Sequence, residues 1–211
     1  MTWDPGDHTK RRNYHHGNLR EALIEAALRL IGEKGPSGFT VAEAARAAGV
    51  SPAAPYRHFK DREQLMADIA RRGFEAFAAS LRAAWDHGKP SPRSALVRTG
   101  RAYLDFARRE PAAYSAMFES GAAVHDDPEL RKAGEEAFTV LREACERVIA
   151  TLPPERRPPP MMVALHIWSM SHGIASLFTR GDAARRPIPM SPEDLLEAGV
   201  LVYLDGFAGP P

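Results

Sequence analysis

The chain has 211 residues, of which 44% are hydrophobic and 26% are charged, as in an ordinary soluble protein of one or two domains. Its single cysteine, Cys145, excludes an internal disulfide and favours a reducing, cytoplasmic setting. The formal net charge is +1, but residues 1–72 carry 12 Lys or Arg against 9 Asp or Glu, whereas the remainder carries 16 against 18. This small basic excess is compatible with a nucleic-acid partner without establishing one.

The first 17 residues are polar and lack the apolar core of a secretory signal. We interpret 1–17 as a flexible basic arm that brings Arg11 and Arg12 to a DNA backbone or minor groove, although a solvated tail explains the same composition. The adjacent His15 and His16 have no further ligand at a suitable spacing, so we expect no metal site. A helix is predicted from Asn18 to about Lys34, ended by Gly35 and Pro36.

Residues 40–62 predict two short helices joined by a tight turn. Thr40 and Glu43 have the spacing of a capping box, Gly49 can end that helix, and Ser51 with Pro52 can begin the next. This is the pattern of a helix-turn-helix, but an ordinary helical hairpin would look similar. Polar donors on one turn of the second helix favour DNA binding: Tyr56, Arg57, His58 and Lys60.

The run G-V-S-x-x-x-x-Y-x-H-F-K-D-R, Gly49 to Arg62, resembles the DNA-binding signature of the tetracycline-repressor-like (TetR-type) regulators. The resemblance implies phosphate contacts from Thr40, Tyr56, His58 and Lys60 or Arg62. It also implies base contacts from the segment Ser51 to Tyr56, which includes Pro52 and Ala53, and a core role for Phe59. Pro55 departs from the family pattern, where many relatives carry an aliphatic residue. Because proline lacks an N–H and disfavours a helical residue before it, we expect a short or bent recognition helix.

Further helices are predicted from Asp61 to about Trp85, from Ser91 and Pro92, from Pro111 through Phe118, from Asp127 and Pro128, and from Ser191 and Pro192 through Phe207. Residues 158–179 contain no charge over a span long enough to cross a membrane. Polar residues such as His166, Ser169 and His172 favour instead a helix buried by protein. Cys145 is expected to be a small core residue, with a redox switch as the alternative.

The last two predicted helices are apolar around most of their circumference. We therefore expect both to pack on a second copy of the chain, through Ser169, Gly173, Ser176, Leu196, Val200 and Tyr203. A two-fold dimer places its recognition helices about 34–36 Å apart, so a near-palindromic operator is predicted.

The motif W-x-x-x-H-G, with Trp168, His172 and Gly173, resembles the TetR-type branch named for its Trp-His-Gly C-terminal domain, as does the segment from Tyr103 to Phe118. That resemblance implies nine helices, a homodimer and an effector pocket among the fourth to eighth of those helices. Candidate pocket residues, each of which could equally be plain core, are Tyr103, Phe106, Tyr114, Met117, Phe118, Trp168 and His172.

Together these patterns predict an all-α protein of about nine helices. The expected parts are the arm 1–17, a helix-turn-helix head 18–62 that continues into a connecting helix 61–85, and a C-terminal domain 86–211 for dimerisation and effector binding. We expect a DNA-binding repressor released from its operator by a small, largely apolar molecule; the alternative is an architectural DNA-binding protein without ligand control. No cofactor is expected, and the absence of a phosphate loop or a nucleophile motif argues against an enzyme.

Overall fold

The computed structural model describes residues 19–120, 127–179 and 188–208, and these residues contain helices and no strand. The eight α-helices are α1 (Leu19–Lys34), α2 (Val41–Ala47), α3 (Arg62–Trp85), α4 (Pro92–Arg109), α5 (Pro111–Glu119), α6 (Pro128–Ile149), α7 (Pro160–Thr179) and α9 (Pro192–Ala208). The predicted all-α class is therefore confirmed. Asn18, the predicted cap of the first helix, lies outside the described residues.

Helix starts follow the predicted capping residues. Ser91 accepts from the backbone N–H of Ser94 at the start of α4, and Asp127 accepts from two amides at the start of α6. Each of these helices has proline at its first position, where the missing N–H would have had no helical partner anyway. Asp61 caps α3 in the same way by accepting from the amide of Gln64.

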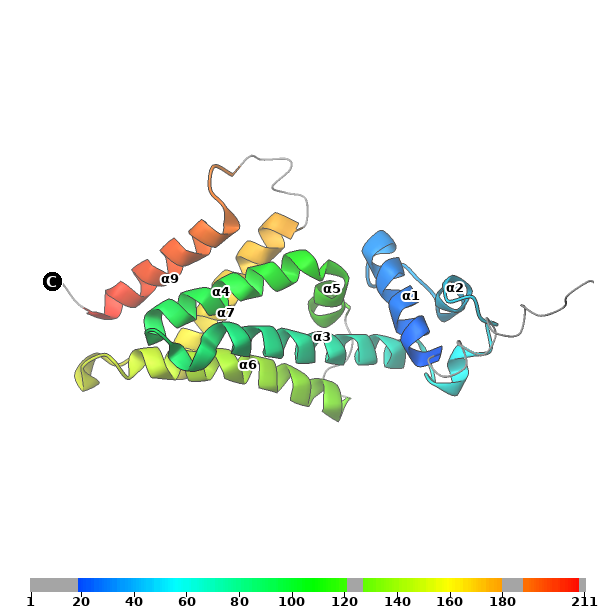
Figure 1. The fold of residues 1–211 in the computed structure, drawn as a ribbon, viewed down its shortest axis with the longest axis horizontal. Coiled ribbons are helices and arrows are strands. Elements are labelled where there is room, and N and C mark those ends of the chain that lie inside the picture. The colour runs from blue at the N-terminus through cyan, green and yellow to red at the C-terminus, as the bar shows by residue number, and fades with distance from the viewer. Residues whose placement is uncertain (1–18, 121–126, 180–187, 209–211) are drawn as a thin grey trace, which may run out of the picture.

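The helices form a head and a body, and α3 runs from one into the other (Figure 1). The head core is built by α1, α2 and the first turns of α3, with Leu65 and Ile69 among its buried residues. The body core takes Ala67, Ala70, Phe74 and Phe77 from α3 and is completed by α4, α5, α6, α7 and α9. One rigid helix thus serves two separate hydrophobic cores.

The short helix α5 also belongs to both cores. Ala116 is fully buried in the head core and Ala112 packs beside it, whereas Tyr114 and Met117 are buried in the body core. Figure 1 shows α5 between α4 and α1. A displacement of α5 would therefore disturb head and body together.

Helix α9 is fixed on α4 by packing and by charge. Leu196 lies so close to Gly100 that a Cβ at that glycine would be 3.0 Å from Leu196 Cδ2. Ion pairs join Arg93 to Asp205 at 2.6 Å and Arg108 to Glu193 at 3.3 Å, and Arg101 also pairs with Glu197. Leu196 and Val200 are each only 2% exposed, so they belong to the core of a single chain. The prediction that these two residues face a second copy is corrected accordingly.

Helix α7 is long and apolar enough to cross a membrane by length and composition. It packs against α4, α6 and α9, and its buried residues include Val163, Ile167 and Ala175. Its other side remains exposed through Met161, Met162, Leu165 and Leu177. The helix is therefore an integral part of the body that keeps one apolar face open.

Candidate nucleic-acid interface and effector cluster

The first helix of the predicted motif is fixed at both ends by side-chain and turn chemistry. The hydroxyl of Thr40 accepts from the amide of Glu43 at 3.2 Å, and the Glu43 carboxylate accepts from the amide of Thr40 at 2.8 Å, which is the predicted capping box. At the other end Gly49 has a positive φ of 71°, and the amides of Gly49 and Val50 bond back to Arg46 and Ala45. These bonds form a Schellman motif, which directs the chain into the next segment.

The Lys34 ammonium strengthens this arrangement. It lies 2.8 Å from the Glu43 carboxylate, and this hydrogen bond, together with those from Thr40, lowers the pKa of Glu43 to about 2. The carboxylate therefore stays ionised, and keeps its cap, well below neutral pH.

The second element is not the α-helix that was predicted. Residues 51–60 form a turn followed by a short 3-10 helix, Pro55–Arg57. An α-helix beginning at Ser51 would need the amide of residue 55 to bond the Ser51 carbonyl, and Pro55 has no amide hydrogen. The amide of Ala54 takes that carbonyl instead, at 3.0 Å, and the amides of His58 and Phe59 bond the carbonyl of Pro55. The predicted shortening at Pro55 is thus larger than expected.

This 3-10 segment still presents the predicted donors outward. Tyr56 is 60% exposed, and Arg57, His58 and Lys60 are also exposed. Between them Phe59 is 1% exposed within the head core, and the Arg20 guanidinium lies 5.6 Å from the centre of its ring. Phe59 therefore anchors the segment, as the family resemblance implied, and holds its neighbours on the surface.

Arg62 is placed differently from the other predicted phosphate ligands. Its Nε donates to the carbonyl of Phe39 at 3.1 Å, a terminal nitrogen donates to the carbonyl of Pro36, and its guanidinium lies 5.1 Å from the centre of the Phe39 ring. Arg62 thus ties α3 to the loop before α2. The family resemblance implied a phosphate contact from Lys60 or Arg62, and of these two residues Lys60 is the exposed one.

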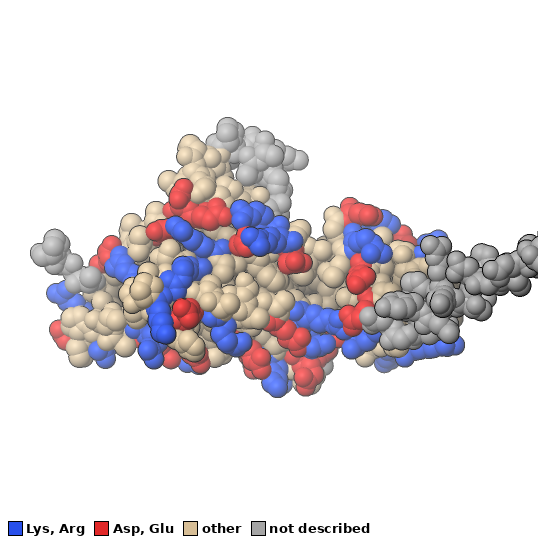
Figure 2. Space-filling model, in the orientation of Figure 1, with Lys and Arg blue, Asp and Glu red and all other residues tan. Residues whose placement is uncertain are grey.

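The remaining predicted DNA contacts lie on the same surface or outside the described residues. Thr40, Ser51, Pro52 and Ala53 are exposed. The arm with Arg11 and Arg12 lies outside the described residues. On the face shown in Figure 2, basic and acidic side chains are interspersed and form no broad field of one sign. The described surface seen in this view therefore carries no extended potential of one sign.

The predicted effector residues form one aromatic cluster in the body. Trp168 is surrounded by four aromatic rings in edge contact with it, at centroid distances of 5.4–6.2 Å: Phe77, Tyr103, Phe118 and Phe138. At the polar end of the cluster, the hydroxyl groups of Tyr103 and Tyr114 lie 3.2 Å apart. Nδ1 of His172 lies 3.1 Å from the Tyr103 hydroxyl and 2.7 Å from the Tyr114 hydroxyl. Burial, and then the neighbouring Tyr114, raises the pKa of Tyr103 above its ordinary value.

This cluster has the chemistry of a small apolar ligand site with one polar end, but its members pack directly on one another. Tyr103, Phe106, Tyr114 and Met117 are at most 7% exposed, and Phe118, Trp168 and His172 are half-buried. A cavity of about 460 Å³ lies instead between head and body, and of the seven predicted residues only Phe106 lines it.

Several residues that join α1 to α3 belong to no sequence motif that could have identified them. Arg72 of α3 holds Glu21 of α1 with two hydrogen bonds of 2.5 and 2.6 Å, which raise the pKa of Arg72 and lower that of Glu21. Asp68 is buried and pairs with Arg20 and Arg71, each at 2.8 Å. These residues join α1 to α3, and their spacing in the sequence gives no sign of the contact.

The predicted dimer residues divide between two environments. Ser169 and Gly173 are exposed on α7, and a Cβ at Gly173 would meet nothing within 4 Å. Ser176 and Tyr203 are half-buried, and the Tyr203 hydroxyl lies 2.8 Å from Nδ1 of His166. With Met161, Leu165 and Leu177, the exposed residues form an apolar face on α7 that the rest of the described chain leaves uncovered.

Two family models match the sequence. Residues 23–69 match "Bacterial regulatory proteins, tetR family", and residues 96–203 match "Tetracyclin repressor-like, C-terminal domain". The second description names no Trp-His-Gly branch, so that finer assignment stays a prediction.

Curated relatives carry the same kind of description. The HTH-type transcriptional regulator BetI of Cronobacter sakazakii is 31% identical over 163 residues, which are 75% of this chain and 74% of the relative. BetI of Rhizobium meliloti is 39% identical over 105 residues, 47% of this chain and 50% of the relative. For most of these relatives the match spans about half of their length.

Solved structures share the fold over nearly the whole chain. A protein of unknown function from a Rhodococcus species has a TM-score of 0.76 at 27% identity and covers 93% of this chain and 98% of its own. The TetR family transcriptional regulator PfmR from Thermus thermophilus has a TM-score of 0.65 at 22% identity, covering 88% of this chain and 96% of its own, which is a likeness of fold.

Proposed function

Because the chain belongs to the TetR family of bacterial regulatory proteins, we propose that it is a dimeric, cytoplasmic transcriptional repressor that a small apolar molecule releases from DNA. The observation that carries this proposal is the exposed row Tyr56, Arg57, His58 and Lys60, held at the surface by the buried Phe59. Hydroxyl, guanidinium, imidazole and ammonium groups on one short segment suit phosphate oxygens and base edges.

Sequence preference should come from few direct contacts. Pro52 and Ala53 offer only apolar surface to bases, such as the methyl group of thymine. Arg57 is exposed on the 3-10 turn and is the one side chain there that can contact guanine with two hydrogen bonds. We therefore assign much of the remaining preference to the arm 1–17 and to the shape of the DNA.

The proposed dimer uses the open face of α7. Met161, Leu165 and Leu177 are 49% exposed each, and Val202 of α9 is 74% exposed. Small residues, Ser169 and Gly173, between the large ones permit a second helix to approach closely. A two-fold pair formed here would carry two heads, as a near-palindromic operator requires.

The proposed release mechanism follows from the double role of α5. An apolar molecule that enters the aromatic cluster must separate Tyr114 from His172, because the hydroxyl lies only 2.7 Å from the imidazole. Tyr114 is on the same short helix as Ala116, which is fully buried in the head core. A ligand that binds better to a conformation with displaced α5 would thereby shift the heads away from the spacing that DNA needs.

Footprinting of the purified protein on the DNA that flanks its own gene tests this function. We expect one discrete, near-palindromic protected region, and we expect Tyr56→Ala and His58→Ala to weaken binding at all sites. Phenol and indole, as uncharged aromatic probes, should weaken protection in the wild type and less so when Trp168→Ala alters the cluster. Equal protection of random DNA would instead identify an architectural protein.

A further inference from the structure

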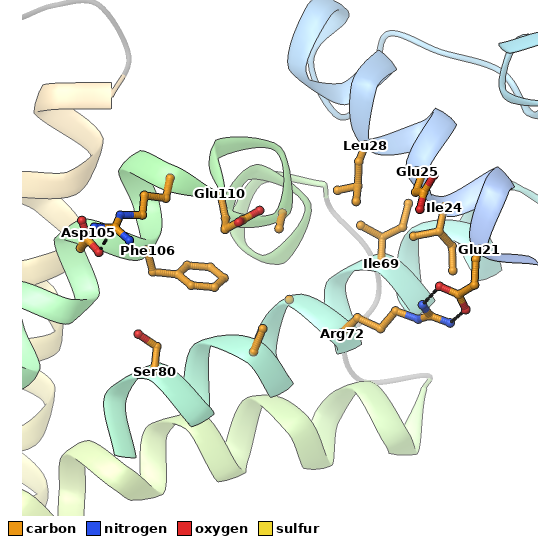
Figure 3. A pocket seen from close by; sticks show the side chains of 14 residues that line it. Glu21, Ile24, Glu25, Leu28, Ile69, Arg72, Ser80, Asp105, Phe106 and Glu110 are labelled. Carbon is orange, nitrogen blue, oxygen red and sulfur yellow. Dashed lines mark hydrogen bonds and ion pairs between the residues drawn. The ribbon is translucent and has the colours of Figure 1, made fainter. Parts of the chain in front are cut away.

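The cavity between head and body is a separate site from the aromatic cluster. It has a volume of about 460 Å³, within the range of about 300–1,000 Å³ typical of small-molecule pockets. Its walls come from α1, α3, α4 and α5, and Figure 3 shows side chains of α1 on one side and Phe106 with Glu110 on the other. Ile24, Leu28 and Ile69 give it an apolar lining.

The charged residues of this cavity are unbalanced. Four carboxylates line it, from Glu21, Glu25, Asp105 and Glu110, against the two guanidinium groups of Arg72 and Arg109. Both guanidinium groups are already engaged. Arg72 binds Glu21 at 2.5 and 2.6 Å (Figure 3), and Nε of Arg109 lies 3.0 Å from Asp105 Oδ2.

The other two carboxylates, Glu25 and Glu110, are exposed. In the part of the chain that the structure describes, neither side chain has a hydrogen bond or ion pair. Glu25 comes from α1 in the head, and Glu110 lies where α4 ends and α5 begins, in the body. Two free negative charges therefore border an apolar cavity from opposite units of the protein.

We propose that this cavity binds a protonated amine with an apolar body, a ligand class separate from the uncharged molecule expected in the aromatic cluster. The unpaired carboxylates of Glu25 and Glu110 attract the ammonium group, and the apolar part covers Ile24, Leu28 and Phe106. A carboxylate ligand is rejected by the same charges, and a neutral ligand gains only the apolar contact.

Calorimetric titration of the full chain at pH 7 and low salt tests the site with three matched probes: n-hexylamine, 1-hexanol and hexanoate. We expect the amine to bind at least about tenfold more tightly than the alcohol, and hexanoate to bind more weakly than either. The double variant Glu25→Gln, Glu110→Gln should weaken amine binding about tenfold, equal to about 1.4 kcal/mol, and leave alcohol binding unchanged.

Two control variants locate the effect. Glu33→Gln removes an exposed carboxylate from the same helix α1 outside the cavity, so amine binding should not change. Leu28→Ala removes apolar lining and should weaken the amine and the alcohol alike. Circular dichroism checks that each variant remains folded.

Several results would overturn the proposal: no amine binding at millimolar concentration, equal binding of amine and alcohol, or an unchanged affinity in the Glu25, Glu110 double variant. Loss of amine binding in Trp168→Phe would move the site to the aromatic cluster and overturn it as well. None of these measurements involves DNA, so their outcome is independent of the proposed repressor function.

Discussion

Lys60 and Arg62 should differ sharply in how they affect DNA binding, although both are basic and only two residues apart. Each positive side chain that neutralises a phosphate contributes about 0.9 to the slope of log affinity against log salt concentration. Lys60 is exposed in both copies of the proposed dimer, so Lys60→Ala should reduce the magnitude of the slope by about 1.8. Between about 0.05 and 0.2 M salt, wild-type affinity should then fall roughly 12-fold more than that of the variant.

Arg62→Ala should act on stability instead. It removes two hydrogen bonds to the carbonyls of Phe39 and Pro36 and the contact with the Phe39 ring. Because Arg62 is only partly buried, we expect a loss of about 1–3 kcal/mol in the free energy of unfolding, measured by urea titration, with little change in the salt slope.

Fluorescence anisotropy of a labelled operator duplex at several salt concentrations measures these slopes. Lys132→Ala is the matched control, because it removes one exposed charge from α6 in the body and should leave the slope unchanged. The reasoning is refuted if Lys60→Ala and Lys132→Ala give the same slope as wild type. It is equally refuted if Arg62→Ala lowers the slope as Lys60→Ala does without lowering stability.

Three further predictions concern the cap, the thiol and the open face. Thr40→Ala should reduce the free energy of unfolding by about 1 kcal/mol through loss of the α2 cap. Because the pKa of Glu43 is lowered from 4.5 to about 2, the stabilisation that its carboxylate gives should be complete above pH 4.5 and disappear as the pH falls towards 2. Acid titrations of wild type and Glu43→Gln measure this difference, and identical acid profiles would contradict it. Burial raises the pKa of the Cys145 thiol to about 12, so it should react with iodoacetamide at about pH 8 far more slowly in native protein than in urea, and equal rates would exclude a core role. Leu165→Glu places a charge on the open face of α7 and should shift the protein from dimer to monomer in sedimentation, whereas Glu135→Lys on α6 should not. A wild type that sediments only as a monomer would contradict the proposed dimer.

Local chemistry in the sequence was sufficient to predict most helix boundaries. The signals that start and end these helices act over three or four residues. They are the capping box at Thr40 and Glu43, the prolines at the first positions of α4, α5 and α6, and Gly49 with its positive φ. Such interactions need no partner from elsewhere in the chain, which is why spacing alone predicts them. The gathering of Tyr103, Tyr114, Trp168 and His172 also followed from the resemblance to a family, although their mutual contacts did not.

Tertiary packing decided the rest. Nothing local distinguishes Lys60 from Arg62, yet one remains exposed while the other binds the loop before α2, 23 residues earlier in the chain. The sequence predicted that Leu196 and Val200 face a second copy, but the packing of α9 on α4 and α7 buries both. Apolar side chains pack on whichever apolar face the fold brings near. The cavity with Glu25 and Glu110 exists only because α5 places the body against α1, and such a long-range arrangement leaves no periodic signal in the amino-acid sequence.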